Sequence, residues 1–295
     1  MKFYIVTPCF NSLQWLQNAI RSVADQAGEG VEVHHHVQDG LSTDGTPAWL
    51  EEWQQTHADT PGYTFTYESA KDAGMYDAIN TAWSKMPEDA DVTAHLNSDE
   101  QYLPDALRGV AQEFMAHPKA DIIEATHVFV DRDGHYLCHR RPVKPNKWIS
   151  MRAIQLMTCC TFHKVSTFRR HGIRFDTRFR IFGDVILYRD IVNFGVEVCT
   201  APSVVSTTFA ITGENLAWRE SSIKERALVD SITPRWVMTL FPLFWHLSGL
   251  SRRIVDCFHP APRSISIYHG GGEGRRTEAI TRPSCQYTPR VFVGQ

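Results

Sequence analysis

The strongest constraint on the fold is a regular alternation of short apolar runs and amphipathic stretches along the first 116 residues. Each apolar run is short enough for a buried strand, and the stretches between them repeat apolar residues at the spacing of one helix face, as Leu13, Leu16 and Ile20 do. The predicted strands are residues 3–6, 31–38, 63–67 and 92–96. This order favours an α/β fold, in which a mostly parallel central sheet is flanked by helices on both faces.

Polar residues gather where these predicted strands end. Residues 7–11 follow the first strand, Asp39 and Gly40 end the second, and residues 97–100 follow the fourth. In open α/β sheets, ligands bind in the crevice beyond the carboxyl ends of the strands. We therefore expect these clusters to share one ligand site.

Carboxylates are the candidates for chemistry, and each has an ordinary alternative. Asp39 can accept a hydrogen bond from a base N–H of uracil or guanine, or it can order a turn. Asp99, with Asn97 and Glu100, offers the oxygen ligands that Mg²⁺ or Mn²⁺ prefers beside a diphosphate, although turns often have this composition. Asp184 begins an apolar helix, where it is either a helix cap or a general base for an acceptor hydroxyl.

Charge and motif content exclude several classes of protein. The formal net charge of −3 gives no basic field for nucleic acid, so local groups must hold any anionic ligand. The glycine run at residues 270–274 opens no helix and the chain has no GxxxxGK[ST] loop, which excludes a dinucleotide fingerprint and a P-loop. The seven cysteines are scattered without a CxxC pair, and no signal-peptide pattern precedes the first strand. Both features favour a cytoplasmic protein with reduced thiols.

The second half of the chain follows a different pattern. Residues 121–139 indicate a β-hairpin and residues 198–211 a strand, whereas residues 259–295 are rich in Gly, Pro, Arg and Ser and indicate a loosely ordered tail. Residues 236–250 are apolar but too short for a membrane span, and Pro242 interrupts them. With arginines at both ends, residues 231–255 fit either an interfacial helix on an anionic membrane or a helix packed on the preceding domain.

Five segments match a known pattern in the same order along residues 1–215. They are TPCFN at 7–11 ("TPxYN"), VQDGLSTDGT at 37–46 ("DGxSTDGT"), ESAKDAGMYDAIN at 68–80 ("SExDxGxYDAxN"), LNSDE at 96–100 ("LNxDD", a version of the metal-binding DxD) and RIFGD at 180–184 (an ED-type base motif). Together they resemble the family 2 glycosyltransferases with the GT-A fold, in particular the bacterial enzymes of polysaccharide assembly.

The resemblance implies a domain plan and a reaction. Residues 1–215 would form the GT-A catalytic domain, 216–258 a C-terminal helical segment and 259–295 the tail. A sugar would move from a UDP- or GDP-sugar to the hydroxyl of a saccharide or lipid-linked acceptor in surface polysaccharide biosynthesis, with inversion of the anomeric centre. The protein would be cytoplasmic, with peripheral contact to the inner face of the membrane as an open expectation.

The resemblance also implies roles for the matched residues. The donor would be bound by Thr7, Pro8, Asn11, Asp39, Asp72, Asn80, Asn97 and Asp99; Mn²⁺ or Mg²⁺ would be held by Asp99 and Glu100; the base would be Asp184. Three positions depart from the pattern. Many relatives have aspartate at 97 and 100, which predicts weaker metal binding here, and Gly183 stands where an acidic or small residue is common.

Two rival functions follow from the same features. A sugar nucleotidyltransferase would need a glycine-rich, basic loop after the first strand, and residues 7–12 contain neither glycine nor a basic residue. A non-catalytic nucleotide-sugar-binding or scaffold protein of a polysaccharide assembly complex is supported by the departures at positions 97, 100 and 183.

Overall fold

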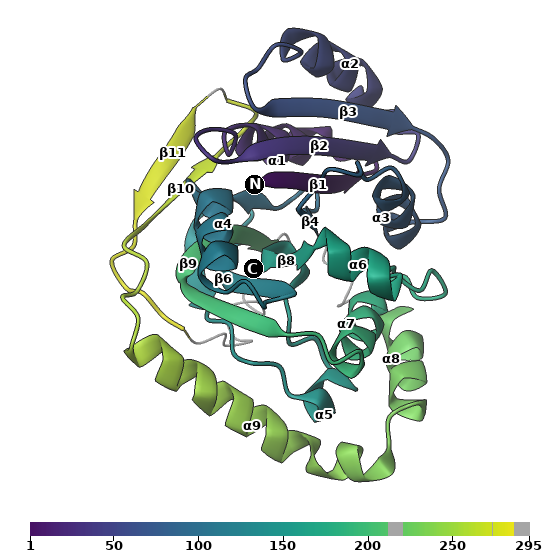
Figure 1. Ribbon diagram of the computed structural model, residues 1–295, viewed down its shortest axis with the longest axis vertical. Coiled ribbons are helices and arrows are strands. Elements are labelled where there is room, and N and C mark those ends of the chain that lie inside the picture. Colours follow the sequence, from purple (N-terminus) through teal and green to yellow (C-terminus); the bar gives the residue numbers. More distant parts are fainter. Residues whose placement is uncertain (212–220, 273, 286–295) are drawn as a thin grey trace.

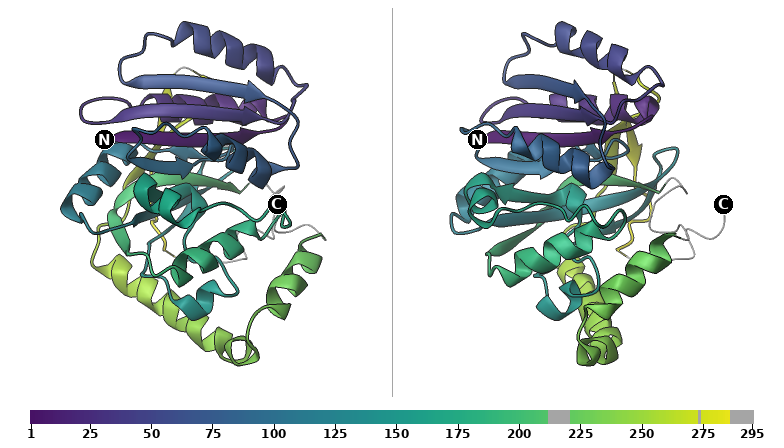
Figure 2. Two further views of the ribbon diagram at one scale, coloured as in Figure 1. Left: turned by 45° about the vertical axis from the view of Figure 1, so that its right-hand side comes forward. Right: turned by 90° about the vertical axis from the view of Figure 1, so that its right-hand side faces the viewer.

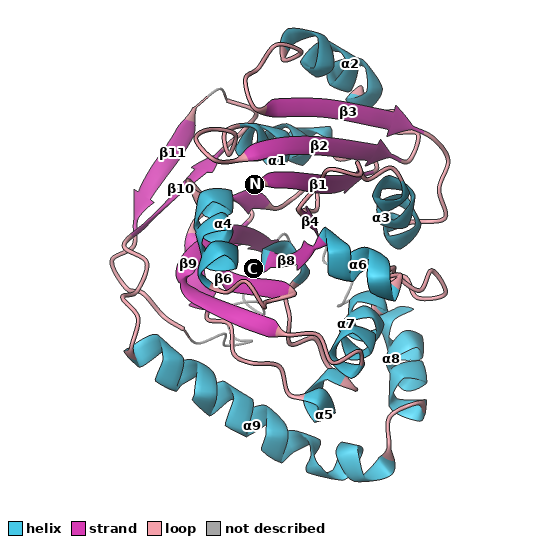
Figure 3. Cartoon of the chain, viewed as in Figure 1, coloured by secondary structure: helices cyan, strands magenta, loops and turns pink. Residues whose placement is uncertain are grey.

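The structure is a computed structural model that describes residues 1–211, 221–272 and 274–285. Its centre is a nine-stranded sheet, with helices on either side (Figure 1 and Figure 3). In spatial order the strands are β3 (Tyr63–Ser69), β2 (Glu32–Asp39), β1 (Lys2–Cys9), β4 (Val92–His95), β8 (Thr161–Lys164), β6 (Ile122–Asp131), β9 (Val198–Ile211) and β5 (Gln101–Tyr102), and β7 (Tyr136–Arg140) pairs with β6.

The N-terminal part of the sheet is parallel, as expected for an α/β fold. β1 pairs in parallel with both β2 and β4, and β2 pairs in parallel with β3. The register places Cys9 opposite Asp39 and Asp39 opposite Ser69. The carboxyl ends of these three strands therefore meet at one edge, where the sequence predicts a ligand site.

Helices cover both faces of this sheet because side chains alternate along its strands. Ile5 of β1 packs in the core cluster that holds α1 (Leu13–Ala24), α2 (Thr46–Thr56) and α4 (Ala106–Ala116). Its neighbours Tyr4 and Val6 belong to the opposite cluster, with α3 (Met75–Ser84), α6 (Val165–His171) and α7 (Gly183–Asn193). The expected fold class is confirmed.

The described part of the C-terminal segment is helical, with α8 (Ser221–Ser231) and α9 (Arg235–Cys257), whereas the short helix α5 (Lys147–Ser150) and the 3₁₀ turn η1 (Thr158–Cys160) lie between β7 and β8 in the sequence. The sequence predicts an interruption at Pro242, but α9 is continuous through it. Proline has no N–H to donate to the carbonyl one turn earlier in the helix. Because Pro242 is on the exposed side of α9, water can donate to that carbonyl instead. Of the helices in the described ranges, none is both long and apolar enough to span a bilayer.

The described part of the tail, residues 259–272 and 274–285, differs from the expectation of a loosely ordered segment, and residues 286–295 lie outside the described residues. β10 (Ser264–Tyr268) and β11 (Arg275–Ala279) form an antiparallel hairpin. The backbone N–H and C=O of Tyr268 bond to the side chain of Gln101, 167 residues away, at 2.8 and 3.0 Å. Ile265 and Ile267 are buried in a small cluster with Leu103 and Val128. Composition could not predict this order, since the partners lie far away in the sequence.

Candidate active site

The first group of the candidate site is the carboxylate of Asp39 at the end of β2. Asp39 is fully buried. One of its oxygens accepts the Ser42 hydroxyl at 2.5 Å and the other accepts the Ser69 hydroxyl at 2.5 Å, while the Ser42 N–H donates to the carboxylate at 3.1 Å. These bonds fix the carboxylate between the loops that follow β2 and β3.

Gly40 allows Asp72 and Phe10 to approach Asp39. A Cβ at position 40 would lie 2.7 Å from Oδ2 of Asp72 and 3.4 Å from the ring of Phe10. The other oxygen of Asp72 accepts the Gly74 N–H at 2.8 Å, directly before α3. Phe10 is 65% exposed, so an uncovered aromatic ring lies beside Gly40, as does the carboxylate of Asp72. The sequence analysis did not single out Phe10, although it stands at the aromatic position of the TPxYN-like segment.

The loops around this ring contain unusual backbone conformations. Asn11 and Leu41 have φ of 47° and 64°, a left-handed region that residues with side chains seldom adopt. The Asn11 N–H donates to the Ser42 hydroxyl at 2.7 Å, and its side-chain oxygen accepts the Thr43 N–H at 2.8 Å. Conformations of this kind persist where surrounding contacts enforce them, and they cluster at ligand sites.

The turn after β4 carries the predicted metal residues and joins the first loop through a hydrogen bond between the hydroxyls of Ser12 and Ser98 at 3.0 Å. Oε2 of Glu100 accepts the Asn97 N–H at 2.8 Å. Oε1 of Glu100 and Oδ1 of Asn97 are buried without a hydrogen-bond partner in the structure. Burial raises the pKa of Asp99, and burial together with the neighbouring Asp99 charge raises the pKa of Glu100.

This turn fits a divalent cation that shares its ligands with a bound phosphate. The orphaned oxygens and the desolvated Asp99 carboxylate are the hard donors that Mg²⁺ and Mn²⁺ prefer, and a cation would offset the cost of their burial. Within the described residues, no cluster of three or more His, Cys, Asp or Glu side chains could hold a metal by itself. Magnesium sites that use substrate phosphates characteristically have only one or two protein carboxylates.

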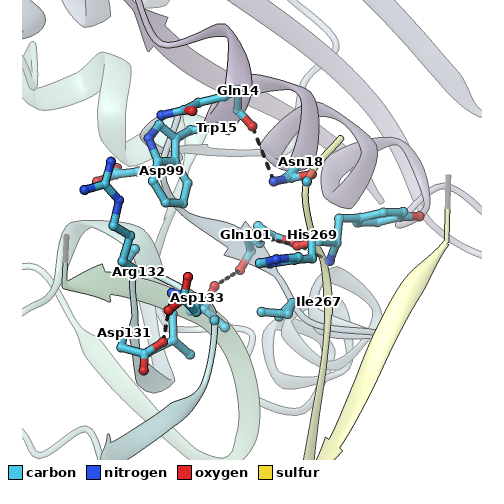
Figure 4. Close-up of a pocket in the computed structure, with 16 residues that line it drawn as sticks. Gln14, Trp15, Asn18, Asp99, Gln101, Asp131, Arg132, Asp133, Ile267 and His269 are labelled. Atoms are coloured by element: carbon cyan, nitrogen blue, oxygen red, sulfur yellow. Dashed lines mark hydrogen bonds between the residues drawn. The ribbon is translucent and has the colours of Figure 1, made fainter. Parts of the chain in front are cut away.

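A pocket of about 190 Å³ opens beside Asp99 (Figure 4). α1 supplies Trp15 and Asn18 to its wall, and His269 follows β10 on the other side. Arg132, from the turn between β6 and β7, extends toward Asp99. The pocket thus has a mixed polar and aromatic lining next to the predicted metal residue.

Asp184 lies in the first turn of α7, on the α3 side of the sheet. Its Oδ1 accepts the Val185 N–H at 2.7 Å. The Tyr76 hydroxyl accepts the Asp184 N–H at 3.4 Å and donates to the carbonyl of Ile181 at 3.0 Å. Burial raises the pKa of Asp184 to about 6, against the opposing effects of the Val185 N–H and the Arg226 charge. A carboxylate near this value is mostly ionised at neutral pH and still accepts protons readily.

Gly183 is required by the packing of Tyr76. A Cβ at position 183 would lie 2.5 to 2.9 Å from three carbons of the Tyr76 ring, which stacks on Phe175 at 4.4 Å between centroids. The departure from the family pattern at this position therefore has a steric cause. It does not weaken the placement of Asp184, which the same tyrosine contacts.

α8 holds the loop that precedes Asp184. The Glu225 carboxylate accepts the backbone N–H groups of Arg180, Ile181 and Phe182 at 2.9, 2.9 and 3.0 Å. The guanidinium of Arg226 lies 4.4 Å from the centroid of the Phe182 ring. The sequence analysis missed both α8 residues, because no motif connects them with a loop more than 40 residues earlier.

Several of the predicted site residues have side chains that are buried or bonded elsewhere in the protein, and so they do not face the candidate site. Pro8 is buried at the end of β1, and the Thr7 hydroxyl faces His35 at 2.9 Å. The Asn80 side chain is bonded on both sides to the backbone of Phe175, at 2.9 Å each. Glu100 is turned into the interior. The structure instead brings together Asn11, Asp39 and Asp72. Ser12 joins this group to the Asn97–Asp99 turn through its bond to Ser98. Asp184 contacts Tyr76 of α3, the helix that begins shortly after Asp72.

Comparison with known proteins gives a consistent result. The model of the family described as glycosyl transferase family 2 matches residues 4–190 of the 295-residue chain. S. aureus TarS 1–349 in complex with UDP-GlcNAc is a similar solved structure, with 15% identity, a TM-score of 0.56, and coverage of 78% of this chain and 64% of that chain. Mannosyltransferase PcManGT from Pyrobaculum calidifontis, in complex with GDP-Man and Mn²⁺, gives 19% identity, a TM-score of 0.51, and coverage of 76% and 60%.

At these identities the structural likeness shows the fold alone. The chain spans less than two thirds of the length of these similar structures, and only 39% of a longer S. aureus TarS chain. No protein with a curated description matches the sequence.

Proposed function

Because the chain belongs to glycosyl transferase family 2 and has the GT-A fold, we propose that it transfers a sugar from a UDP- or GDP-sugar to an acceptor hydroxyl. The observation that supports this most is the edge of the sheet at which Asp39, Asp72 and the Asn97–Asp99 turn meet, with buried oxygens that have no hydrogen-bond partner among the described residues. Similar structures with UDP-GlcNAc and with GDP-Man lend support to a nucleotide-sugar donor.

In this proposal the nucleotide base lies between Phe10 and Asp39. The exposed ring of Phe10 offers a stacking surface, and stacking does not depend on which base is present. Asp39 is fully buried and would hold the loop beside the base through Ser42 and Ser69; its remaining lone pairs would take a base N–H once these side chains move aside. Thr7, Pro8, Asn11 and Asn80 would shape the site through the backbone and loops that they hold.

The diphosphate lies at the turn after β4. Asp99 would hold Mn²⁺ or Mg²⁺ there with the unpartnered side-chain oxygen of Asn97 beside it, whereas Glu100, the other predicted ligand, points into the interior. When bound, the cation neutralises charge that develops on the leaving diphosphate. Glu100 also keeps the turn in shape through its bond to the Asn97 N–H, and Arg132 can add positive charge from the opposite side of the pocket.

Asp184 would be the general base. It takes the proton from the acceptor hydroxyl as that oxygen attacks the anomeric carbon in line with the departing diphosphate, which inverts the configuration. The raised pKa of Asp184, to about 6, suits this role because the carboxylate is charged at neutral pH and is basic enough to accept a proton. Tyr76 and Glu225 hold the backbone on either side of the base.

The acceptor in this proposal is a saccharide or a lipid-linked saccharide of surface polysaccharide biosynthesis, used by a cytoplasmic protein at the inner face of the membrane. Residues 1–215 would be the catalytic unit, and residues 216–258 its helical attachment. The alternative, a non-catalytic nucleotide-sugar-binding or scaffold protein, would bind a donor without turning it over.

Calorimetric titration of UDP and GDP tests the donor site. We expect one of the two nucleotides to bind tightly only when Mn²⁺ is present, and Asp99→Ala to abolish the metal dependence. Asp59→Ala is the matched control, since Asp59 is an exposed aspartate in the turn after α2, outside the site. Metal-dependent binding that survives in Asp99→Ala would overturn the assignment of the cation to this turn.

A further inference from the structure

α9 carries a stripe of large apolar side chains that the described part of the chain leaves about half exposed. Its members repeat at intervals of four and three residues, which places them on one face of the helix. They are Trp236, Leu240, Leu243, Leu247, Leu250 and Ile254, each between 41% and 54% exposed. Contiguous exposed apolar surface of this kind marks a contact with a membrane or with another protein.

The opposite face of α9 attaches the helix to the rest of the molecule. Val237 and Ser248 are buried. Near the C-terminal end, the Asp256 carboxylate accepts hydrogen bonds from Arg141 at 2.9 Å and from His139 at 2.7 Å. The helix is therefore held by one face, and the stripe is not needed for that attachment.

The charges that border the stripe have one sign. Arg235 and Arg253 are exposed and, 18 residues apart, lie on the same edge of the stripe. Asp256 is the single acidic residue of α9, and its carboxylate is engaged by His139 and Arg141. Among the described residues of α9, the exposed surface consequently combines leucines with two arginines and no free carboxylate.

An aromatic and basic cluster lies at the N-terminal end of the stripe. Trp236 packs edge-on against Trp148 of α5 at 4.5 Å between ring centroids, and the Lys147 ammonium lies 4.3 Å from the centroid of the Trp148 ring. Tryptophan and lysine together are typical of the boundary between hydrocarbon and water in membrane proteins.

α8 and its connection to α9 carry further exposed apolar side chains. Ile223 and Leu228 of α8, and Ile232 in the connection to α9, are 66%, 46% and 46% exposed, and Lys224 beside them is exposed too. Both helices lie on the outside of the molecule, and in all views α9 is at the end of the long axis opposite α2 and β3 (Figure 1 and Figure 2). A flat partner could meet this end without touching the parallel sheet.

We propose that the exposed face of α8 and α9 docks on the surface of a bilayer that contains anionic lipid, with the leucine stripe in the interface and the basic residues at the headgroups. A second copy of the chain fits less well, because stripes related by twofold symmetry would bring arginine edges together without an acidic residue to pair with them. An interfacial helix with basic residues at its edge requires only apolar depth and anionic headgroups.

The docking surface connects directly to the proposed catalytic base. α8 bonds through Glu225 to the loop that precedes Asp184, and α9 continues from α8 after a short connection. Bilayer docking would thus keep Asp184 close to the membrane surface. This consequence, which rests on the proposed function, selects a lipid-linked acceptor over a free saccharide.

Flotation of the full chain with vesicles tests the docking surface without any donor or acceptor. We expect the chain to float with vesicles of phosphatidylcholine and phosphatidylglycerol, and to float poorly with phosphatidylcholine alone. Leu243→Glu combined with Leu247→Glu should remain at the bottom of the gradient. Met115→Glu is the matched control, because Met115 is an equally exposed apolar residue on α4, and it should float like the wild type.

A second variant keeps the test independent of the leucines. Arg235→Gln combined with Arg253→Gln should lower the partition coefficient on anionic vesicles about 30-fold, from roughly fivefold per arginine near the surface. Failure of the wild type to float with either vesicle would overturn the proposal. So would a dimer in light scattering that the Leu243→Glu, Leu247→Glu variant converts to a monomer, because the stripe would then join two copies. If the wild type floats with anionic vesicles but turns over no donor, the result contradicts the proposed function and leaves the docking surface standing.

Discussion

At the scale of single residues, the account depends on the environment of Asp184. The carboxylate is desolvated enough for its pKa to rise to about 6, yet it keeps a backbone hydrogen bond that favours the charged form. A general base needs this combination, since proton transfer is most effective when the pKa lies near the working pH.

Asp184→Asn should lower kcat by about 10²–10⁴-fold, or roughly 3–5 kcal/mol of barrier, because the amide cannot accept the proton. Donor affinity, measured by calorimetry, should stay at the wild-type value. Asp190→Asn in the same helix is the control and should leave both quantities unchanged. A parallel loss of donor binding would show that Asp184 holds the donor rather than acting as the base.

The pH dependence of turnover should follow the same carboxylate. Because the pKa of Asp184 is raised and the base must be ionised, kcat should increase with pH through about 6 and then level off. The profile has to be measured at saturating donor and metal, since burial raises the pKa of Asp99 as well. A flat profile between pH 5 and 8 would be incompatible with this base, given the roughly one-unit window on each side of its pKa.

At the scale of secondary-structure elements, the start of α7 is held from two sides. Tyr76 of α3 packs against Gly183 and bonds to the backbone of Ile181 and Asp184. Glu225 of α8 bonds to the preceding turn. The position of the base therefore depends on contacts between helices that are far apart in the sequence.

Gly183→Ala should destabilise the chain and disturb the base together. The new methyl group would meet the Tyr76 ring at 2.5 Å, and overpacking of this kind costs about 1–3 kcal/mol. Thermal unfolding and kcat should both fall. Gly249→Ala in α9 is the matched control: nothing lies within 4 Å of its Cβ, so the better helix propensity of alanine should raise stability slightly. Equal melting temperatures for the two variants would contradict the packing argument.

Glu225→Gln should lower kcat without changing donor affinity. The amide keeps only one acceptor oxygen for the three N–H groups of residues 180–182, and it carries no charge. Hydrogen bonds to an ionised acceptor contribute about 1.5–3 kcal/mol each, so the substitution weakens the attachment of this loop. Glu51→Gln, the same change at an exposed position of α2, should behave like the wild type. Unchanged kcat in Glu225→Gln would show that the loop keeps its shape without α8.

At the scale of the whole molecule, the part of the site near the parallel strands was predictable from the sequence. Asp39 and Asp99 stand directly after apolar runs, and parallel strands bring their carboxyl ends to the same edge. Their positions follow from the hydrophobic pattern that locates each strand and from the rule that ligands bind beyond the carboxyl ends of parallel strands.

The remainder depends on contacts between distant segments. Periodicity did not predict β8 within residues 151–195, and composition indicated a loose tail where β10 and β11 pack against Gln101. The inward orientation of Thr7, Asn80 and Glu100 follows from partners in neighbouring elements. Side-chain direction at such positions is set by packing, which a motif does not encode.

Nucleoside diphosphate release from a panel of UDP- and GDP-sugars, with Mn²⁺ and then with EDTA, tests the central claim most directly. The account predicts that one donor is turned over, slowly by water or faster with its acceptor, and that EDTA abolishes the release. If donors bind with metal but none is turned over even with membrane-derived lipid-linked saccharides present, the chain is a binding or scaffold protein, and the proposed reaction is contradicted.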